Sequence, residues 1–245
     1  MRPNFNTDNI LRTIAHLKGK RVLLITTSTR WEGDNELPKS SRLAHIVADH
    51  LGEGVTILDA SKMHIYQCEG NVSKSGGNNC GDKASVLKDA EKNPSGCHRC
   101  WASFNHADDE LWKISRELLQ SDVVIFFGSV RWGSANGIYQ KIIERLSWLN
   151  NRHSTLGEDN IIQNIEVGVI LTGHNWNGSS VIELQKQVLA YYGFQVPHEL
   201  SWNWQWTSDS NDESPEGYLQ DPQDFEVRFG DLERLEESFT KWNIK

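Results

Sequence analysis

Largely apolar runs alternate along this chain with stretches whose apolar residues recur at helical spacing. The runs predict five strands, at 21–28, 54–60, 122–129, 165–172 and 194–200. The stretches between and after them predict helices at 7–18, 40–51, 108–119, 138–149, 181–193 and 231–242. Uninterrupted apolar runs are typical of strands that are buried on both faces of a parallel sheet.

This alternation predicts an α/β fold, a five-stranded parallel sheet with helices on both faces. No internal repeat or low-complexity linker divides the chain, so we expect a single domain over residues 1–245. It contains one long insertion at about 61–105, rich in Gly, Asn and Ser, and a C-terminal extension at about 201–245. Loops as long as this insertion are seldom passive connections, so we expect it to be structured.

The charge of the chain narrows the classes of function. The chain has 33 acidic and 25 basic residues, a net charge of −8, whereas nucleic-acid-binding domains carry a basic face. We therefore expect no nucleic-acid partner. No apolar run approaches the roughly 20 residues that cross a bilayer, and residues 1–20 lack the apolar core of a secretory signal. The expectation is a cytoplasmic protein with no membrane partner, whose four cysteines stay reduced.

The loop after the first strand is a candidate phosphate site. Ligands of open α/β sheets lie beyond the carboxyl ends of the strands, and this loop contains Ser28 and Arg30 and leads to Ser40 and Ser41 at a helix start. Free backbone N–H groups there favour a phosphate. The loop has neither a Walker motif nor GxGxxG, which disfavours P-loop and dinucleotide-binding Rossmann domains. An ordinary loop in which Ser40 or Ser41 caps the helix is about equally consistent with these residues.

Three segments together resemble a known family. They are S-x-R followed by SSRLA, then SDVVIFFGSVRWGSANGIYQKIIERL at 121–146, then LTGHNWNGSS at 171–180. In each segment a loop falls at the carboxyl end of a predicted strand, and the order and composition of the three loops are similar to the NADPH-dependent FMN reductase family. The resemblance covers roughly residues 21–198 and implies a flavodoxin-like fold with bound FMN.

The resemblance also implies roles for individual residues. The FMN phosphate would bind Ser28, Arg30, Ser40 and Ser41. The ring would lie between the second and third segments, and the implied contacts there are Ser129, Val130, Arg131, Trp132, Gly133, Thr172, Gly173 and His174. Backbone N–H groups from Val130 to Gly133 would bind the polar edge of the ring. NAD(P)H would pass a hydride to the flavin, and His174 is either a proton donor to the acceptor or an exposed loop residue.

Two positions depart from the family pattern. Ser129 stands where the family usually has Pro, and Arg131 stands where it usually has Tyr. Stacking by that Tyr is lost, and Tyr139 and Trp132 are the candidates to compensate. Arg131 either places positive charge near the flavin N1/C2 carbonyl or is a surface residue in an ion pair, and the sequence favours neither.

The cysteines raise a second resemblance. Cys97 and Cys100 form a CxxC shortly before an Asp-Asp-Glu helix start, which is similar to iron–sulfur flavoproteins, but the closely following cysteines of those proteins are missing. Cys68 and Cys80 lie upstream without a CxxC of their own. Reduced cysteines in a structured insertion are therefore the favoured interpretation, and a four-cysteine metal or cluster site remains the alternative.

These observations predict an enzyme, an FMN-dependent NAD(P)H oxidoreductase that reduces a small acceptor such as a quinone or a flavin. Relatives of this kind are commonly dimers or tetramers, so a homodimer or homotetramer is expected. One alternative is a non-enzymatic electron-transfer protein of the flavodoxin or iron–sulfur flavoprotein type. Another is a binding module that has kept the fold and lost FMN. The long insertion favours the reductase, because shuttle flavodoxins are usually shorter.

Overall fold

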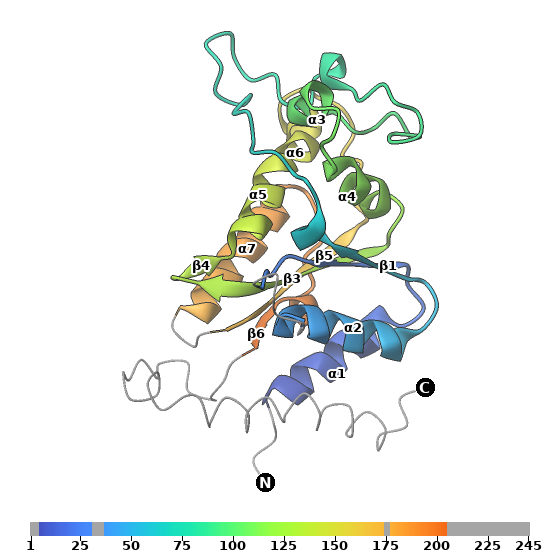
Figure 1. Cartoon of the computed structure of the whole chain (residues 1–245), viewed down its shortest axis with the longest axis vertical. Coiled ribbons are helices and arrows are strands. Elements are labelled where there is room, and N and C mark those ends of the chain that lie inside the picture. The colour runs from blue at the N-terminus through green and yellow to red at the C-terminus, as the bar shows by residue number, and fades with distance from the viewer. Residues whose placement is uncertain (1–4, 31–36, 174–176, 205–245) are drawn as a thin grey trace.

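The computed structural model describes residues 5–30, 37–173 and 177–204, which form a twisted sheet between two layers of helices (Figure 1). Five parallel strands lie in the order β2-β1-β3-β5-β6, and the two-residue β4 pairs with β3 in the antiparallel sense. The strands are β1 (Val22–Thr26), β2 (Val55–Asp59), β3 (Val123–Arg131), β4 (Ser134–Ala135), β5 (Glu166–Thr172) and β6 (Trp202–Trp204). The predicted parallel α/β sheet is therefore present, with one short antiparallel strand that the sequence did not suggest.

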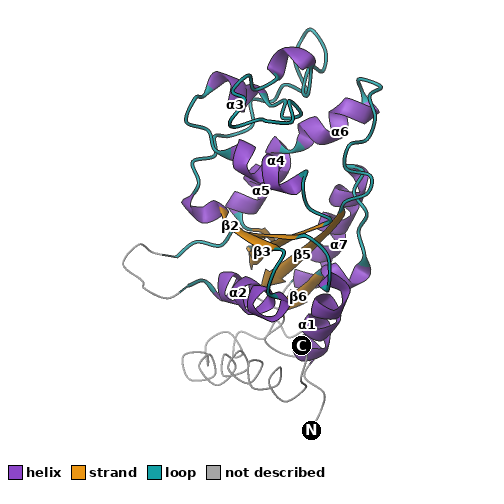
Figure 2. Cartoon of the chain, turned by 90° about the vertical axis from the view of Figure 1, so that its right-hand side faces the viewer, coloured by secondary structure: helices purple, strands orange, loops and turns teal. Residues whose placement is uncertain are grey.

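Helices cover both faces of the sheet (Figure 2). One face packs against α1 (Phe5–Leu17) and α2 (Lys39–Leu51), which share a core with β1 and β3. The other face packs against α4 (Leu111–Leu118), α5 (Gly137–Arg145), α6 (Ser147–Ser154) and α7 (Gly178–Tyr191). No helix among the described residues is long and apolar enough to span a membrane.

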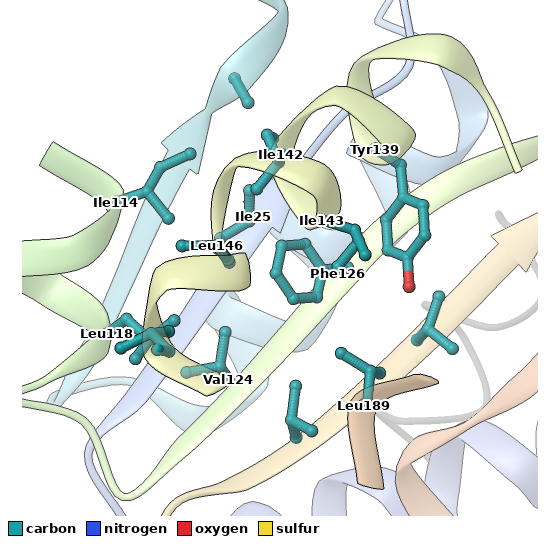
Figure 3. Packing of buried hydrophobic residues seen from close by; sticks show 14 of the residues in the cluster. Ile25, Ile114, Leu118, Val124, Phe126, Tyr139, Ile142, Ile143, Leu146 and Leu189 are labelled. Carbon is teal, nitrogen blue, oxygen red and sulfur yellow. The ribbon is translucent and has the colours of Figure 1, made fainter. Parts of the chain in front are cut away.

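The second face carries the larger core (Figure 3). Phe126 of β3 lies edge-on to Tyr139 of α5, with 5.4 Å between ring centroids. The predicted helix at 138–149 is divided at Leu146 into α5 and α6, and Leu146 itself is buried. Both helices still turn an apolar side toward the sheet, as the helical spacing predicted.

The predicted strand at 194–200 is wrong. In that segment Gln195 forms a single bridge with Glu166, and Pro197 leads into a short 3-10 helix, η3 (His198–Leu200). Pro has no N–H to donate to a ladder, so a regular strand cannot continue through it. Gly168 permits the close approach of η3, because a Cβ there would lie 2.0 Å from the carbonyl oxygen of Leu200. The fifth parallel strand is β6, two residues further along the chain.

The insertion occupies residues 60–110 between β2 and α4. It contains two 3-10 turns, η1 (Ala60–Lys62) and η2 (Lys83–Ser85), the short helix α3 (Trp101–Asn105) and irregular chain between them. It lies beside α5 and α6, on the side of the molecule away from α1 and α2 (Figures 1 and 2). The predicted helix at 231–242 and the extension beyond Trp204 lie outside the described residues.

Candidate cofactor site

The start of α2 brings together three of the predicted phosphate ligands. Ser28, Ser40 and Ser41 are all buried, and the Ser40 hydroxyl donates to the Ser28 hydroxyl at 2.7 Å. Neither Ser40 nor Ser41 caps the helix, because the N-cap is Pro38, which makes no side-chain cap bond. With no acidic residue in its first turn, α2 presents backbone N–H groups and neutral hydroxyls, a combination that suits an anion. Arg30 is exposed on the same loop.

Strand register aligns further hydroxyls with this helix start. Thr26 of β1 pairs with Phe127, and Ser129 of β3 pairs with Thr172 of β5. Side chains alternate between faces, so Ser129 and Thr172 point to the face covered by α2, and Ser28 follows the end of β1 two residues after Thr26. Thr172 donates its hydroxyl to the Gly128 carbonyl at 3.3 Å. Hydroxyls therefore lie at or just beyond the carboxyl ends of the three central strands.

The β3–β4 hairpin is the second predicted segment. Arg131 pairs with Ser134 across a two-residue turn in which Trp132 has φ 48° and Gly133 has φ 71°. Two positive φ values are typical of the type I′ turn that closes tight hairpins. Trp132 at the tip is 96% exposed, and Arg131 is exposed beside it. Among the residues described, Arg131 has no ion-pair partner, so the ion-pair interpretation of Arg131 has no support here.

Asn136 holds this edge together, and the sequence did not identify it. Its Oδ1 accepts from the Thr27 hydroxyl at 3.0 Å and from the Ser129 N–H at 3.1 Å, while its Nδ2 donates to the Thr27 carbonyl at 2.7 Å. Gly128 makes room for it, because a Cβ there would lie 2.6 Å from Asn136 Oδ1. The sequence signal was an Asn three residues after the Gly of the hairpin turn, which is too common to single out.

The loop after β5 approaches the hairpin from the other side. Gly173 has φ 135°, and a Cβ there would lie 3.3 Å from the Val130 carbonyl oxygen. Asn177, with φ 60°, donates its side-chain amide to the Gly133 carbonyl at 3.0 Å. These contacts bring the second and third predicted segments together at one edge of the sheet. His174 lies outside the described residues.

Tyr139 cannot replace the lost stacking Tyr. Its side chain is fully buried in the core on the α5 side, next to Phe126 and Ile143 (Figure 3). Its position on the buried stripe of α5 was visible in the helical spacing, and that signal outweighs its nearness in sequence to the hairpin. Of the two proposed substitutes only Trp132 is exposed at the site.

A buried ion pair anchors the insertion, and the sequence missed this as well. Arg145 at the end of α5 donates to both carboxylate oxygens of Asp109, at 2.9 and 3.0 Å, and neither side chain is exposed. Its remaining donors reach the Tyr66 carbonyl at 2.7 Å, the Ser103 hydroxyl at 3.0 Å and Cys100 Sγ at 3.2 Å. All five N–H groups of the guanidinium thus have acceptors. The pair joins α5 to three separate parts of the insertion.

Two of the four cysteines and His98 belong to the packed interior of the insertion. All four cysteines are free, and Cys80 and Cys100 are buried. Burial raises the pKa of Cys80 to about 11, so it is a protonated thiol at neutral pH. His98 is also buried, lies edge-on to Trp148, and has its pKa lowered by burial to about 3. No group of three or more His, Cys, Asp or Glu side chains that could hold a metal occurs in the described ranges.

Comparison with protein-family models and with curated proteins finds no match. Solved structures do match. The azoreductase AzrA aligns with a TM-score of 0.52 at 12% identity, covering 90% of this chain and 99% of AzrA. RosB, solved with bound 8-demethyl-8-formylriboflavin-5′-phosphate, aligns with a TM-score of 0.51 at 13% identity, covering 90% of this chain and 80% of RosB. At such low identity the likeness concerns the fold.

The chain has the flavodoxin-like fold. Once β4 is set aside, its strand order is the 2-1-3-4-5 order of that fold, with a topological switch point between β1 and β3. The predicted fold class is confirmed. Ligands of such sheets bind at the switch point outside the carboxyl ends of the strands, which is where Ser28, Ser40 and Ser129 lie.

The residues at this edge fit a flavin mononucleotide. A phosphate needs N–H and O–H donors, which the start of α2 and its buried serines provide. The Ser129 hydroxyl is buried without a hydrogen-bond partner among the described residues, which is costly unless a ligand supplies one. A flat ring needs two facing walls, and the hairpin and the β5 loop approach each other.

Proposed function

We propose that this protein binds FMN at the carboxyl edge of its sheet and catalyses NAD(P)H-dependent reduction of a small acceptor such as a quinone or a flavin. The observation that carries the proposal is the convergence of three loops with ligand-binding chemistry at the switch point. Paired hydroxyls lie at an uncapped helix start, and further hydroxyls lie at the ends of β3 and β5, where β3 continues into a hairpin with an exposed indole. The azoreductase and the flavin-bound RosB, which have this fold, are consistent with it.

Each loop has its own task in the proposed site. The N–H groups of the first turn of α2, with Ser28, Ser40 and Ser41, hold the phosphate. The turn N–H groups of Trp132 and Gly133 face the polar edge of the ring. Arg131 extends from the same strand face as Ser129, which favours its role as a cation beside the ring. Bound FMN would supply the two-electron chemistry, taking a hydride from NAD(P)H and passing it to the acceptor.

The phosphate site is tested by FMN titration of Arg30→Ala/Ser40→Ala. Losing one charge-assisted and one neutral hydrogen bond should weaken FMN binding at least tenfold, with an unchanged circular dichroism spectrum. Arg21→Ala/Ser115→Ala is the matched control, because Arg21 directly precedes β1 at the opposite edge and Ser115 is buried in α4. Equal affinity in wild type and test variant would remove this loop from the site. A wild type that binds no flavin would refute the proposed function.

The enzyme is distinguished from an electron shuttle by turnover. Oxidation of NAD(P)H by a quinone or free flavin, with no protein partner present, is expected of a reductase. Elemental analysis addresses the cluster-containing alternative, and we expect less than one iron or zinc per chain because the cysteines are poorly spaced for one site. One tightly held metal per chain that disappears in Cys97→Ser would favour the electron-transfer alternative.

A further inference from the structure

Ser129 has a side chain that is buried at the candidate site without a hydrogen-bond partner in the described part of the chain. Its hydroxyl is buried, and no described group donates to it or accepts from it. Its backbone is fully used: the N–H donates to Asn136 Oδ1 at 3.1 Å, and the carbonyl accepts from the Asn136 N–H at 3.0 Å. Only the hydroxyl is left to bind a ligand.

We propose that the Ser129 hydroxyl binds the polyol chain of the flavin and makes the site selective for flavins that carry this chain. The inference rests on the proposed function and adds a specificity-determining residue to it. The unpaired hydroxyl of Ser129 lies at the end of β3, at the edge of the sheet where ligands of this fold bind, so a partner that arrives with the ligand accounts for it.

The place of Ser129 identifies which part of the ligand it meets. Two residues before Ser129, Phe127 pairs with Thr26 of β1, and β1 leads on to Ser28, whose hydroxyl accepts from Ser40 at the helix start that suits a phosphate. After Ser129, β3 runs on to the hairpin that suits the ring, through Arg131 to Trp132. The ligand segment between a phosphate and an isoalloxazine ring is the ribityl chain. Its hydroxyls both donate and accept, which matches a serine hydroxyl.

The test compares Ser129→Ala with wild type for three ligands: FMN, riboflavin and lumiflavin, which has a methyl group in place of the ribityl chain. Dissociation constants are measured by flavin fluorescence. One hydroxyl hydrogen bond corresponds to about a 3- to 10-fold change in affinity. FMN and riboflavin should therefore bind Ser129→Ala about 3- to 10-fold more weakly, whereas lumiflavin should bind both proteins equally.

Ser115→Ala is the matched control. Ser115 lies on α4, is 1% exposed, and also has a hydroxyl without a partner in the described structure. Removing either hydroxyl should leave the melting temperature of the flavin-free protein unchanged or higher, since no bond is lost. Only Ser129→Ala should reduce the rise in melting temperature that FMN produces.

The possible results separate the two proposals. If wild type binds none of the three flavins, both the proposed function and this inference fail. If wild type binds FMN and Ser129→Ala binds it equally well, this inference alone fails. It also fails if lumiflavin binding falls as much as FMN binding, because the hydroxyl then does not meet the chain. A lower melting temperature of flavin-free Ser129→Ala relative to Ser115→Ala would assign the hydroxyl a structural role and likewise overturn the inference.

Discussion

Replacing Arg145 with Met should detach the insertion from α5. Met keeps the length and apolar stem of the side chain and removes the charge and all five donors. Asp109 would then stay buried with only the Ser103 hydroxyl, at 2.6 Å, and the N–H groups of Tyr66 and Leu111, at 3.1 and 3.3 Å. Removing one partner of a fully buried pair leaves an uncompensated charge in the interior.

The expected loss is large for a single substitution. Breaking a buried ion pair by removing one side typically costs about 3–5 kcal/mol. For a chain of this size each kcal/mol corresponds to roughly 2–4 °C in melting temperature, so the melting temperature should fall by about 6–20 °C. Arg21→Met is the control, because the Arg21–Asp122 pair is exposed and such pairs contribute little.

The pH dependence of the stability that Asp109 contributes should change sign in Arg145→Met. In wild type, burial would raise the pKa of Asp109, but hydrogen bonds from Arg145 and Ser103 and the charge of Arg145 outweigh it and hold that pKa below its ordinary value. The stability that Asp109 contributes is therefore present above about pH 4 and is lost on further acidification. In Arg145→Met burial dominates and the pKa of Asp109 rises, so the variant should gain stability as pH falls from 7 towards about 4.5.

Two measurements check this reasoning. Urea denaturation at several pH values gives the difference in unfolding free energy between wild type and Arg145→Met, which should be largest near pH 7 and narrow towards pH 4.5. If the insertion opens separately, Arg145→Met should speed up amide hydrogen exchange in residues 60–110 relative to wild type, and should do so more there than in β1 and β3. A loss below about 1 kcal/mol at pH 7, or a gap that widens on acidification, would show that the pair does not hold the insertion in place.

Three further outcomes are expected. Trp132→Asn should raise the melting temperature by about 2–4 °C, because Asn tolerates the left-handed backbone and an exposed Trp with φ 48° is strained by roughly 1 kcal/mol; a lower melting temperature would reveal stabilising contacts of the indole. His98→Leu should make the unfolding free energy fall less steeply between about pH 6.5 and 4. Burial lowers the pKa of His98 to about 3, so in this range only the unfolded wild-type chain takes up a proton at His98. An unchanged slope of unfolding free energy against pH, measured by urea denaturation, would contradict this. Arg131→Ala should lower the FMN midpoint potential by roughly 10–20 mV, as expected for an exposed cation worth about 0.5–1 kcal/mol; spectroelectrochemistry showing no shift would mean that Arg131 points away from the ring.

The sequence was sufficient for the parallel sheet and for the edge at which to look for a site. Long apolar runs are buried on both sides only in a sheet that helices cover on both faces. The alternation of strand and helix then requires crossover connections, which bring the carboxyl ends of the strands to one edge. The loop at Ser28 was identified on that basis, and those at Ser129 and Thr172 by their resemblance to the FMN reductase family; the structure pairs Ser129 with Thr172 and places all three loops at the carboxyl ends of neighbouring strands. The strand at 194–200 was misplaced because its apolar residues outweighed Pro197, which interrupts strand pairing there, and the approach of η3 to Gly168 appears only in the folded chain.

Other features depended on contacts between residues far apart in the chain. Asn136 bridges two strands only once β1 and β3 are in register, and Arg145 finds Asp109 only when the insertion folds back on α5. Tyr139 and Trp132 lie seven residues apart in sequence, yet one is in the core and the other in solvent. Periodicity decides which residues can face the interior, because it follows from local backbone geometry. Which polar groups meet there, and which hydroxyl is left without a partner, is decided by tertiary packing alone.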